Sequence, residues 1–386
     1  MEEFINKKNI LITNSRLYTS LDLARSFYNS GHNVYTADTN RLNFCSFSKC
    51  VKRNFVIPSP RFDFAAFEKK IAAIVKEYKI DLIVPIHEET LYLAKLNQSI
   101  LNKCELFTSS LSILHKLHNK WLFSNLLDSF GIPSIPIKLI KRFEDLKNVD
   151  FFPYALKPCY SRSSLDLKKI SSIEASPNIL INENKPWIAQ KWMEGKKYCS
   201  YSICRNGKVL AHSVYPNNAA CGYCINFISK NHSKILTWTK NLVSKLNYTG
   251  QIAFDFIETK EGVLYALECN PRATSGMHLL SINPNLSNFF FEDFDEIYQP
   301  PENIGKQFVS AMFLYAFSQR EEKQGFLSFI KKHLKYKDVL FCKKDIKPFL
   351  FQLFVLFSCI HKKFKYKLPL PSAFLYDLYW NNNIED

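Results

Sequence analysis

Strands and helices alternate along the first third of the 386-residue chain, and this alternation limits the possible folds more than any other feature of the sequence. The apolar run 9–13 (NILIT) precedes leucine and aromatic residues at helical spacing, which continue to Gly31. Further apolar runs follow at 34–37 and 82–86, and an amphipathic segment at 64–78 separates them. Strands that alternate with helices in this way form a parallel sheet covered on both faces. The sequence therefore predicts a doubly wound α/β domain.

The turn after the first predicted strand argues against a dinucleotide site. Such a site needs G-x-G-x-x-G at this point, so that a pyrophosphate can approach the backbone. The chain has Thr13-Asn14-Ser15-Arg16 instead. We therefore interpret this domain as a scaffold, one edge of which can line a substrate site.

The character of the sequence changes near residue 118. Asn119-Lys120 opens a predicted helix that ends at Gly131. From about 137 to 290 the chain shows strands and short helices joined by hairpins, which is typical of an α+β domain. From about 296 it is rich in Phe and Lys. We predict three units, which comprise residues 1–117, 118–295 and a basic C-terminal extension, 296–386.

Charge and apolar runs limit the partners and the compartment. The formal net charge is +16, from 51 Lys and Arg against 35 Asp and Glu. We interpret the lysine-rich part of the extension as a solvated face, and expect no specific nucleic-acid partner. The chain begins with acidic residues where a secretory signal would be basic. The longest apolar run, 348–360, is too short to span a bilayer, so we expect a cytoplasmic protein without a transmembrane segment.

The eleven cysteines follow no disulfide framework, which suits a reducing compartment. Cys221 and Cys224 form a C-x-x-C pair. A zinc site would need a second such pair or a histidine pair at matching spacing, and neither is present. We therefore interpret the two residues as reduced thiols in a loop.

The most informative stretch is 251–272, QIAFDFIETKEGVLYALECNPR. Two alternating apolar runs flank Thr259-Lys260-Glu261-Gly262, a pattern that predicts a β-hairpin. If these four residues form the loop, Asp255 pairs with Ala266, and the two carboxylates of the hairpin are diagonal neighbours about 7–8 Å apart at Cα. Three polar side chains then share one face of the ribbon, namely Asp255, Glu268 and Asn270.

Two unpaired acids on an otherwise small and apolar face would be costly. A cation would offset this cost, and Mg²⁺ typically binds one or two carboxylates together with phosphate oxygens and water. Arg272, directly after Asn270-Pro271, adds a planar donor for a carboxylate or phosphate. The alternative is a salt bridge between the acids and Arg272 or a nearby lysine. The hairpin alone leaves both interpretations open.

Two lysines upstream favour the metal interpretation. Lys120 opens a helix, where the helix dipole disfavours a cation. His115, Lys116 and His118 crowd the same corner, and a bound phosphate would explain basic groups at a helix N-terminus. Lys157 lies in the strand-like segment YALKP, where an isolated lysine is otherwise poorly explained.

Taken in order, these features resemble the ATP-grasp superfamily, which includes biotin carboxylase, the large subunit of carbamoyl-phosphate synthase and D-alanine–D-alanine ligase. The resemblance rests on Lys120, Lys157-Pro158, IAQKWMEG at 188–195, FDF at 254–256 and ECNPR at 268–272. It covers residues 8 to 282, and the first unit resembles the preATP-grasp domain of those enzymes. The tail, with DLYW at its end, resembles uncharacterised bacterial ATP-grasp proteins.

The resemblance implies a preATP-grasp domain, an ATP-grasp fold with a small lid, and the C-terminal extension. It also implies an ADP-forming ligase that joins a small-molecule carboxylate to an amine or thiol through an acyl phosphate, with ATP and Mg²⁺, or Mn²⁺ in its place. A homodimer is compatible with it. Residues implied to bind ATP are Lys120, Lys157, Ser161, Arg162, Gln190, Lys191, Trp192 and Met193. The implied metal ligands are Asp255, Glu268 and Asn270, and Arg272 would stabilise the acyl-phosphate stage.

Two departures from the family pattern bear on nucleotide binding. Cys159-Tyr160-Ser161-Arg162-Ser163-Ser164 stands where many members have a Gly-rich loop, and Lys197 falls near the usual ribose-binding glutamate. A carbamoyl-phosphate-synthase-like or carboxylase activity on bicarbonate is one alternative, although no glutaminase or biotin-carrier segment is recognisable. A non-catalytic nucleotide-binding protein with a basic surface is another. The intact set of metal ligands argues against it.

Overall fold

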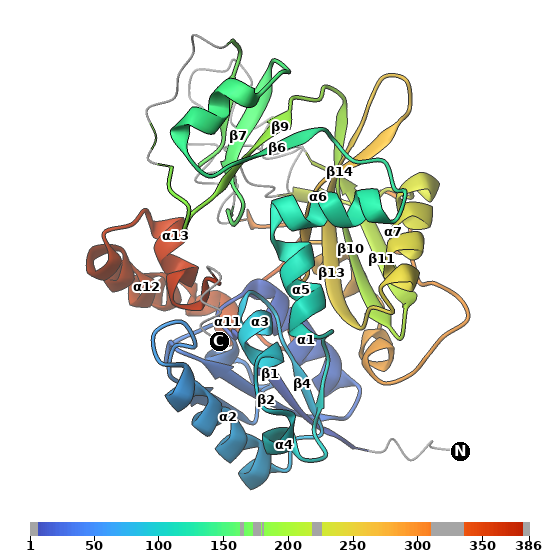
Figure 1. The fold of residues 1–386 in the computed structure, drawn as a ribbon. Helices are drawn as coiled ribbons and strands as arrows, with labels where there is room; N and C mark the ends of the chain where they lie inside the picture. Colours follow the sequence, from blue (N-terminus) through green and yellow to red (C-terminus); the bar gives the residue numbers. More distant parts are fainter. Residues whose placement is uncertain are drawn as a thin grey trace, which may run out of the picture.

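The computed structural model describes residues 7–162, 166–172, 179, 181–217, 226–309 and 336–380, so the Cys221/Cys224 pair lies outside the described residues. Figure 1 shows a parallel sheet with its helices at the bottom, an antiparallel sheet beside it and a small lid sheet at the top. This arrangement confirms the predicted combination of an α/β and an α+β architecture. No helix among these residues has the length and apolar character needed to cross a membrane.

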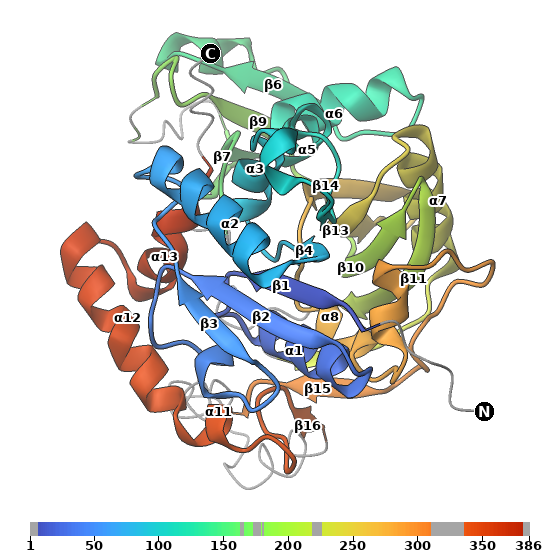
Figure 2. The ribbon, with the colours of Figure 1, turned by 90° about the horizontal axis from the view of Figure 1, so that it is seen from below.

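The first sheet is parallel and five-stranded, in the order β3-β2-β1-β4-β5. Its strands are β1 (Asn9–Thr13), β2 (Asn33–Asp38), β3 (Arg53–Val56), β4 (Leu82–Val84) and β5 (Glu105–Leu106). Figure 2 shows α1 (Tyr18–Asn29) and α2 (Phe64–Tyr78) on opposite faces of this sheet. Alternate strand residues accordingly enter two cores, since Leu11 packs with α2 and Ile10 with α1. The doubly wound sheet predicted from the sequence is confirmed.

Short elements lead from this sheet to the next unit: η1 (Cys45–Phe47), α3 (Glu89–Ala94), α4 (Gln98–Leu101), α5 (Leu111–His118) and α6 (Lys120–Ser129). The side chain of Asn119 accepts hydrogen bonds from the backbone N–H groups of Trp121 and Leu122. This capping interaction separates α5 from α6 and places Lys120 at the start of α6.

The lid is an antiparallel sheet in the order β6-β9-β7-β8. It consists of β6 (Ile137–Ile140), η2 (Phe143–Asn148), β7 (Tyr154–Pro158), β8 (Lys168–Ile170) and β9 (Trp187–Lys191). Residues 192–195 connect it to the next sheet. A Cβ at Gly195 would lie 2.1 Å from the carbonyl oxygen of Glu258, so only glycine allows the connection to pass this close to the neighbouring strand.

The central antiparallel sheet has the order β11-β10-β13-β14. Its elements are β10 (Lys196–Arg205), β11 (Lys208–Pro216), α7 (Ser233–Lys245), β13 (Gly250–Glu258) and β14 (Leu264–Asn270), followed by α8 (Met277–Leu280) and η3 (Leu286–Phe290). Phe254 and Phe256 of β13 are buried together with residues of α6 and α7. The sheet therefore presents its other face to the lid side.

The β13–β14 hairpin exists as predicted, but its predicted register is wrong. Glu258 pairs with Leu264, and a β-bulge between Asp255 and Phe256 shifts the pairing further. Asp255 therefore pairs directly with Glu268 and not with Ala266. The Thr259 N–H bonds to the Val263 carbonyl, so Val263 lies opposite Thr259 and not opposite Glu258. This difference shifts the pairing by one residue, and the bulge shifts it by one more. The two carboxylates are directly opposite each other, closer than the diagonal placement.

The described part of the C-terminal extension packs on the two preceding units. Strands β15 (Gly305–Gln307) and β16 (Lys337–Asp338) form a small sheet with β12 (Asn226–Ile228) of the preceding unit. The chain then continues through α11 (Lys347–Leu350), α12 (Gln352–Tyr366), α13 (Leu370–Leu375) and η4 (Tyr376–Leu378). These last elements run along the first domain (Figures 1 and 2).

Candidate active site

The predicted metal ligands lie together at the junction of the central sheet and the lid. Asp255 and Glu268 are paired across β13 and β14, and Asn270 follows on the same face. All three are partly exposed, whereas Phe254 and Cys269 on the opposite face are buried. The alternation of the strands thus separates a polar face, which can meet a ligand, from the core.

Two lysines reach this face from different elements. Lys120, at the start of α6, places its Nζ 3.2 Å from Oε2 of Glu268 and donates a hydrogen bond of 3.2 Å to the Ser161 carbonyl. Lys157, on β7 of the lid, lies with its Nζ 3.5 Å from the carbonyl oxygen of Leu267. Both lysines are buried. The structure therefore brings together the two predicted lysines and the predicted acids.

Burial and neighbouring charges shift the pKa values of three residues at this junction. Burial, and next the negative charge of Glu268, raise the pKa of Asp255 above its usual range. Burial alone would raise the pKa of Glu268 as well, but Lys120 and Lys157 outweigh it and lower that pKa. Burial lowers the pKa of Lys157 to about 8 against the opposing effect of Glu268. One of these two facing carboxylates resists ionisation, so a bound cation would stabilise the charged form of the pair.

The donor set fits a hard divalent cation. It offers two carboxylates and the amide oxygen of Asn270, which are ligand types that suit Mg²⁺ when phosphate and water complete its coordination. Among the described residues no group of three or more His, Cys, Asp or Glu side chains is placed to hold a metal alone. The arrangement is therefore suited to a cation that arrives with a phosphate ligand.

The four residues expected at the adenine lie where the lid sheet ends. Gln190 is buried in β9, and the backbone N–H of Lys191 bonds to the Pro136 carbonyl. The Trp192 N–H bonds to the Pro153 carbonyl, and Lys169 lies 4.6 Å from the centre of its indole ring. Met193 is partly buried in the same connection. These contacts fix the connection between the two sheets.

Arg162 binds Glu88, a residue that the sequence analysis did not identify. Its Nε donates a hydrogen bond of 2.6 Å to Oε1 of Glu88, and its Nη2 contacts the second carboxylate oxygen. Nη2 also donates a 2.7 Å hydrogen bond to the Trp380 carbonyl, and the guanidinium stacks on the Tyr379 ring. Arg162 thus joins the loop after β7 to the first domain and the C-terminal segment, whereas the family resemblance places it on phosphate.

Arg272 lies beside Asn270, and within the described part of the chain no ion pair joins its guanidinium to Asp255 or Glu268. Its Nη2 donates to Oδ1 of Asn270 at 2.9 Å, and its Nη1 donates to the Ala273 carbonyl at 3.1 Å. Its buried Nε has no hydrogen-bond partner among the described residues. Arg272 therefore orients Asn270, a predicted metal ligand, and keeps one donor available.

Two histidines near Glu88 also carry unpartnered buried nitrogens within the described part of the chain, Nδ1 of His87 and Nε2 of His118. Burial lowers the pKa of His118 to about 3, so its imidazole is neutral and its 3.7 Å separation from Glu88 is not an ion pair. Positive charge on Arg272 contributes to the lowered pKa of both rings, which indicates that the three groups are neighbours. Buried polar atoms without partners mark a place where a polar ligand fits.

The sequence contained a signal for these missed residues. His87, Glu88 and Glu89 begin three positions after the end of the buried strand β4, and all three are buried. Two adjacent acids and a histidine at the carboxyl end of a parallel strand are unusual in a scaffold role, because ligands bind at that edge of such sheets.

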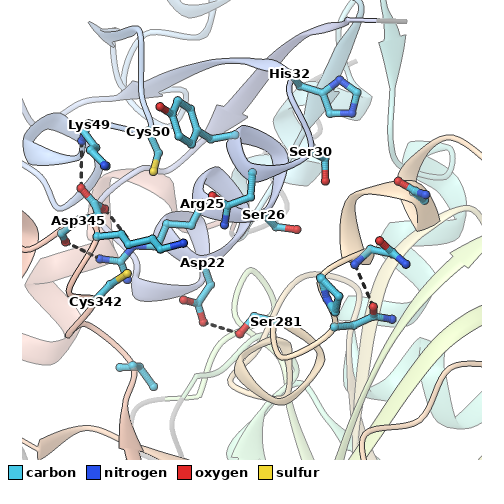
Figure 3. Close-up of a pocket in the computed structure, with 18 of the residues that line it drawn as sticks. Asp22, Arg25, Ser26, Ser30, His32, Lys49, Cys50, Ser281, Cys342 and Asp345 are labelled. Carbon is cyan, nitrogen blue, oxygen red and sulfur yellow. Dashed lines mark hydrogen bonds and ion pairs between the residues drawn. The ribbon is translucent and has the colours of Figure 1, made fainter. Parts of the chain in front are cut away.

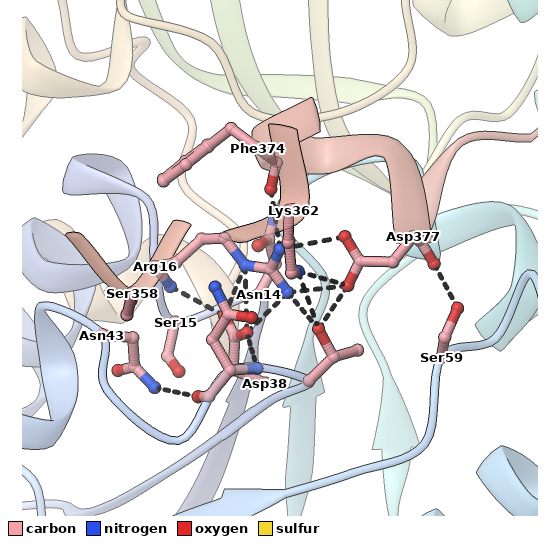
Figure 4. Close-up of polar contacts among 12 residues, drawn as sticks. Asn14, Ser15, Arg16, Asp38, Asn43, Ser59, Ser358, Lys362, Phe374 and Asp377 are labelled. Atoms are coloured by element: carbon pink, nitrogen blue, oxygen red, sulfur yellow. Dashed lines mark hydrogen bonds and ion pairs between the residues drawn. The ribbon is translucent and has the colours of Figure 1, made fainter. Parts of the chain in front are cut away.

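The C-terminal segment closes this edge of the first domain through a network shown in Figure 4. Arg16, fully buried in the turn after β1, forms ion pairs with Asp38 at 2.6 Å and with Asp377 at 3.0 Å. Lys362 of α12 forms a 3.0 Å ion pair with the same Asp377. Trp380 is buried beside Tyr92, and its backbone N–H bonds to Glu88. The turn that lacks the dinucleotide motif is therefore a docking point for the tail.

A cavity of about 1320 Å³ lies elsewhere, between α1 and the start of the extension. Figure 3 shows Asp22, Arg25, Lys49 and Asp345 on its walls. None of the predicted site residues lines it. Its most prominent cation, Arg25, is already paired with Asp345 at 2.9 Å, so we place the candidate site at the carboxylates and not in this cavity.

Comparison with known proteins agrees with this geometry. Residues 117–276 match the profile of the ATP-grasp domain. The carbamoyl phosphate synthase large chain of Thermoanaerobacter sp. (strain X514) is 23% identical over 177 residues, which are 41% of this chain and 16% of the relative. The chain thus matches less than a fifth of the length of this curated relative.

Solved structures share the fold over a larger part of the chain. The L-amino acid ligase from Bacillus licheniformis superposes with a TM-score of 0.57 and 15% identity, covering 70% of this chain and 68% of that one. The biotin carboxylase domain of the Hydrogenobacter thermophilus 2-oxoglutarate carboxylase, in complex with MgADP and bicarbonate, superposes with a TM-score of 0.60 and 14% identity. It covers 77% of this chain and 72% of that one.

Proposed function

We propose that this chain, a member of the ATP-grasp superfamily, is an ATP-dependent ligase that activates a small-molecule carboxylate as an acyl phosphate. The observation that carries the proposal is the convergence of Lys120 and Lys157 on the facing pair Asp255 and Glu268. Two cations and two carboxylates on one polar face match the charges of a nucleotide bound with a divalent cation.

In the proposed reaction an oxygen of the carboxylate substrate attacks the γ-phosphorus of ATP. The bond from that phosphorus to the β,γ-bridging oxygen breaks, and ADP leaves. An amine or thiol then attacks the acyl carbon, the carbon–oxygen bond to phosphate breaks, and the nucleophile loses its proton to solvent. Lys120 and Lys157 hold the phosphate oxygens and offset their charge. Mg²⁺ or Mn²⁺, held by Asp255, Glu268 and Asn270, would neutralise phosphate charge.

The acyl substrate is proposed to bind between Arg272 and the two histidines. Arg272 keeps its Nε available beside a metal ligand, and His87 and His118 each present an unpartnered ring nitrogen. A guanidinium can bind a carboxylate in a planar, two-point manner, and an imidazole nitrogen that carries its proton can donate to the same group. The adenine is proposed to lie against the connection formed by Gln190, Lys191, Trp192 and Met193.

Bicarbonate is the second candidate for the activated carboxylate. It is favoured by the sequence match to carbamoyl phosphate synthase large chains and by the fold shared with a biotin carboxylase domain that binds bicarbonate. Both reactions use the same phosphoryl transfer, so they differ only in the group that occupies the acyl site.

The test is a screen for ADP release that depends on Mg²⁺ and ATP. Pooled amino acids, other carboxylates and bicarbonate are tested separately, and the products are identified by mass spectrometry. We expect release in at least one arm, and its abolition by Glu268→Gln, which keeps the shape and removes one ligand charge. Glu261→Gln, an exposed position in the same hairpin, is the matched control and should retain activity. Retained turnover in Glu268→Gln, or no release in any arm, would refute the proposal.

A further inference from the structure

Helix α12 of the extension is apolar on two faces, and only one of them packs against the part of the protein that the structure describes. On the inner face, Phe351 just before the helix stacks on Phe47 with ring centres 4.6 Å apart, and Val355 is fully buried. Lys362 continues this face through its ion pair with Asp377. The inner face therefore fixes α12 firmly along the first domain.

The outer face carries large apolar side chains in contact with solvent. Their exposed fractions lie between 57% and 71%, and the residues are Leu350, Leu353, Phe354, Phe357 and Phe364. Leu353, Phe354, Phe357 and Phe364 belong to α12, and their spacing of three, four and seven positions places them on one side of that helix. Leu350 ends α11, directly before it. We call these five residues the outer apolar face.

A face of this kind is unusual on a folded protein. Single exposed apolar residues are common, but contiguous patches mark interaction surfaces. Removing apolar side chains such as Phe and Leu from water is favourable in proportion to the area buried, so covering five of them would be strongly favourable. Figures 1 and 2 both show α12 at the outer edge of the molecule, where a large flat partner can reach it.

The exposed charged side chains that α11, α12 and their flanking residues contribute are all of one sign. They come from six lysines: Lys343, Lys344, Lys347, Lys363, Lys365 and Lys367. The only acid between residues 339 and 376 is Asp345, which is buried and paired with Arg25. The partner must therefore combine an apolar interior with negative charge at its surface.

This charge pattern separates the candidate partners. In a symmetric dimer formed through this face, the lysines of one copy would oppose the same lysines of the other, which is unfavourable. An anionic lipid bilayer instead offers acyl chains to the phenylalanines and negatively charged headgroups to the lysines. We propose that α11 and α12 form a membrane-binding surface, through which the protein binds in the plane of an anionic bilayer.

The test measures co-sedimentation of the full-length protein with vesicles of phosphatidylcholine alone and of phosphatidylcholine with phosphatidylglycerol. We expect binding to the anionic vesicles at least tenfold stronger than to the neutral ones, with weakening as salt is raised. The double variant Phe354→Ser/Phe357→Ser should reduce binding to the anionic vesicles at least tenfold. Phe143→Ser, an exposed phenylalanine of the lid, is the matched control and should bind normally.

The charge contribution is tested separately. Replacing Lys363, Lys365 and Lys367 with Gln should remove most of the preference for anionic vesicles, whereas the same replacement of the exposed Lys69, Lys70 and Lys76 on α2 should not. Absence of binding to anionic vesicles, or equal binding by the double phenylalanine variant, would overturn the proposal. A concentration-dependent dimer that this variant abolishes would identify the face as an interface between copies. None of these results depends on whether the protein is a ligase.

Discussion

Arg272 is the residue whose contacts most sharply separate a catalytic role from a structural one. It donates to the metal ligand Asn270 and to a backbone carbonyl, and Pro271 fixes the chain between the arginine and that ligand. Its Nε remains without a partner among the described residues. A purely structural arginine at a buried site would be expected to use all of its donors.

We therefore predict that Arg272→Lys lowers kcat about 10²-fold or more while changing nucleotide affinity much less, because its contact strengthens as charge develops on the acyl phosphate. Lysine keeps the charge but lacks the planar pair of donors. Steady-state kinetics, nucleotide titration and thermal melting of the same variant measure the three effects. If the arginine only orients Asn270, nucleotide affinity or melting temperature will fall and kcat at saturation will hardly change.

At this scale the sequence predicted residue identities better than contacts. Residue spacing placed Asp255, Glu268 and Asn270 on one face because strand alternation does not depend on register. The direct pairing of the two acids could not be foreseen, since a bulge depends on the packing of Phe254 and Phe256 beneath it. The family resemblance placed Arg162 at the phosphates, and its contact with Glu88 could not be foreseen because Glu88 is 74 positions away in the chain.

At the scale of elements, the C-terminal segment contributes most to the edge of the site. Two cations, Arg16 and Lys362, and two anions, Asp38 and Asp377, are buried at one point and neutralise one another. Local periodicity predicted β1, β2, β4, α1, α2, α6 and the β13–β14 hairpin. The docking of the tail was not predicted, because its periodicity does not identify the surface on which it packs.

We predict that Asp377→Asn detaches this segment, since it leaves two buried cations facing a single anion. Removing one partner of a buried ion pair costs about 3–5 kcal/mol. Hydrogen exchange should increase in α12, α13 and the residues up to Trp380, and the loop that carries Arg162 should exchange faster too. Asp293→Asn, at an exposed acid, serves as the control. Unchanged exchange in α12 and α13 would contradict the role given to the network.

At the scale of the whole molecule, the protein interior includes buried polar groups that are uncharged. His212 of β11 is an example remote from the carboxylates, 1% exposed and 2.8 Å from the hydroxyl of Ser202. Burial lowers its pKa to about 3. Its imidazole therefore stays neutral in the folded protein at a pH where it would take up a proton in the unfolded chain.

The sign of the resulting pH dependence follows from this difference. A histidine whose pKa is lower in the folded protein stabilises the fold fully above its unfolded pKa of about 6.5. Below that pH, its contribution to the free energy of unfolding falls by about 1.4 kcal/mol per pH unit. His212→Asn removes this dependence. We predict that the variant melts below the wild type at pH 8, and that the gap narrows or reverses at pH 5. An equal gap at both pH values would show that His212 is not held neutral.

The most direct test of the central claim follows the carboxylate oxygens. With the carboxylate found in the ADP-release screen labelled with ¹⁸O, an acyl-phosphate mechanism transfers one labelled oxygen to inorganic phosphate, because the attacking oxygen leaves with the phosphoryl group. We predict ADP and singly labelled phosphate in equal amounts, measured by mass spectrometry. Labelled AMP together with pyrophosphate would show attack at the α-phosphorus and would contradict the mechanism proposed for this site.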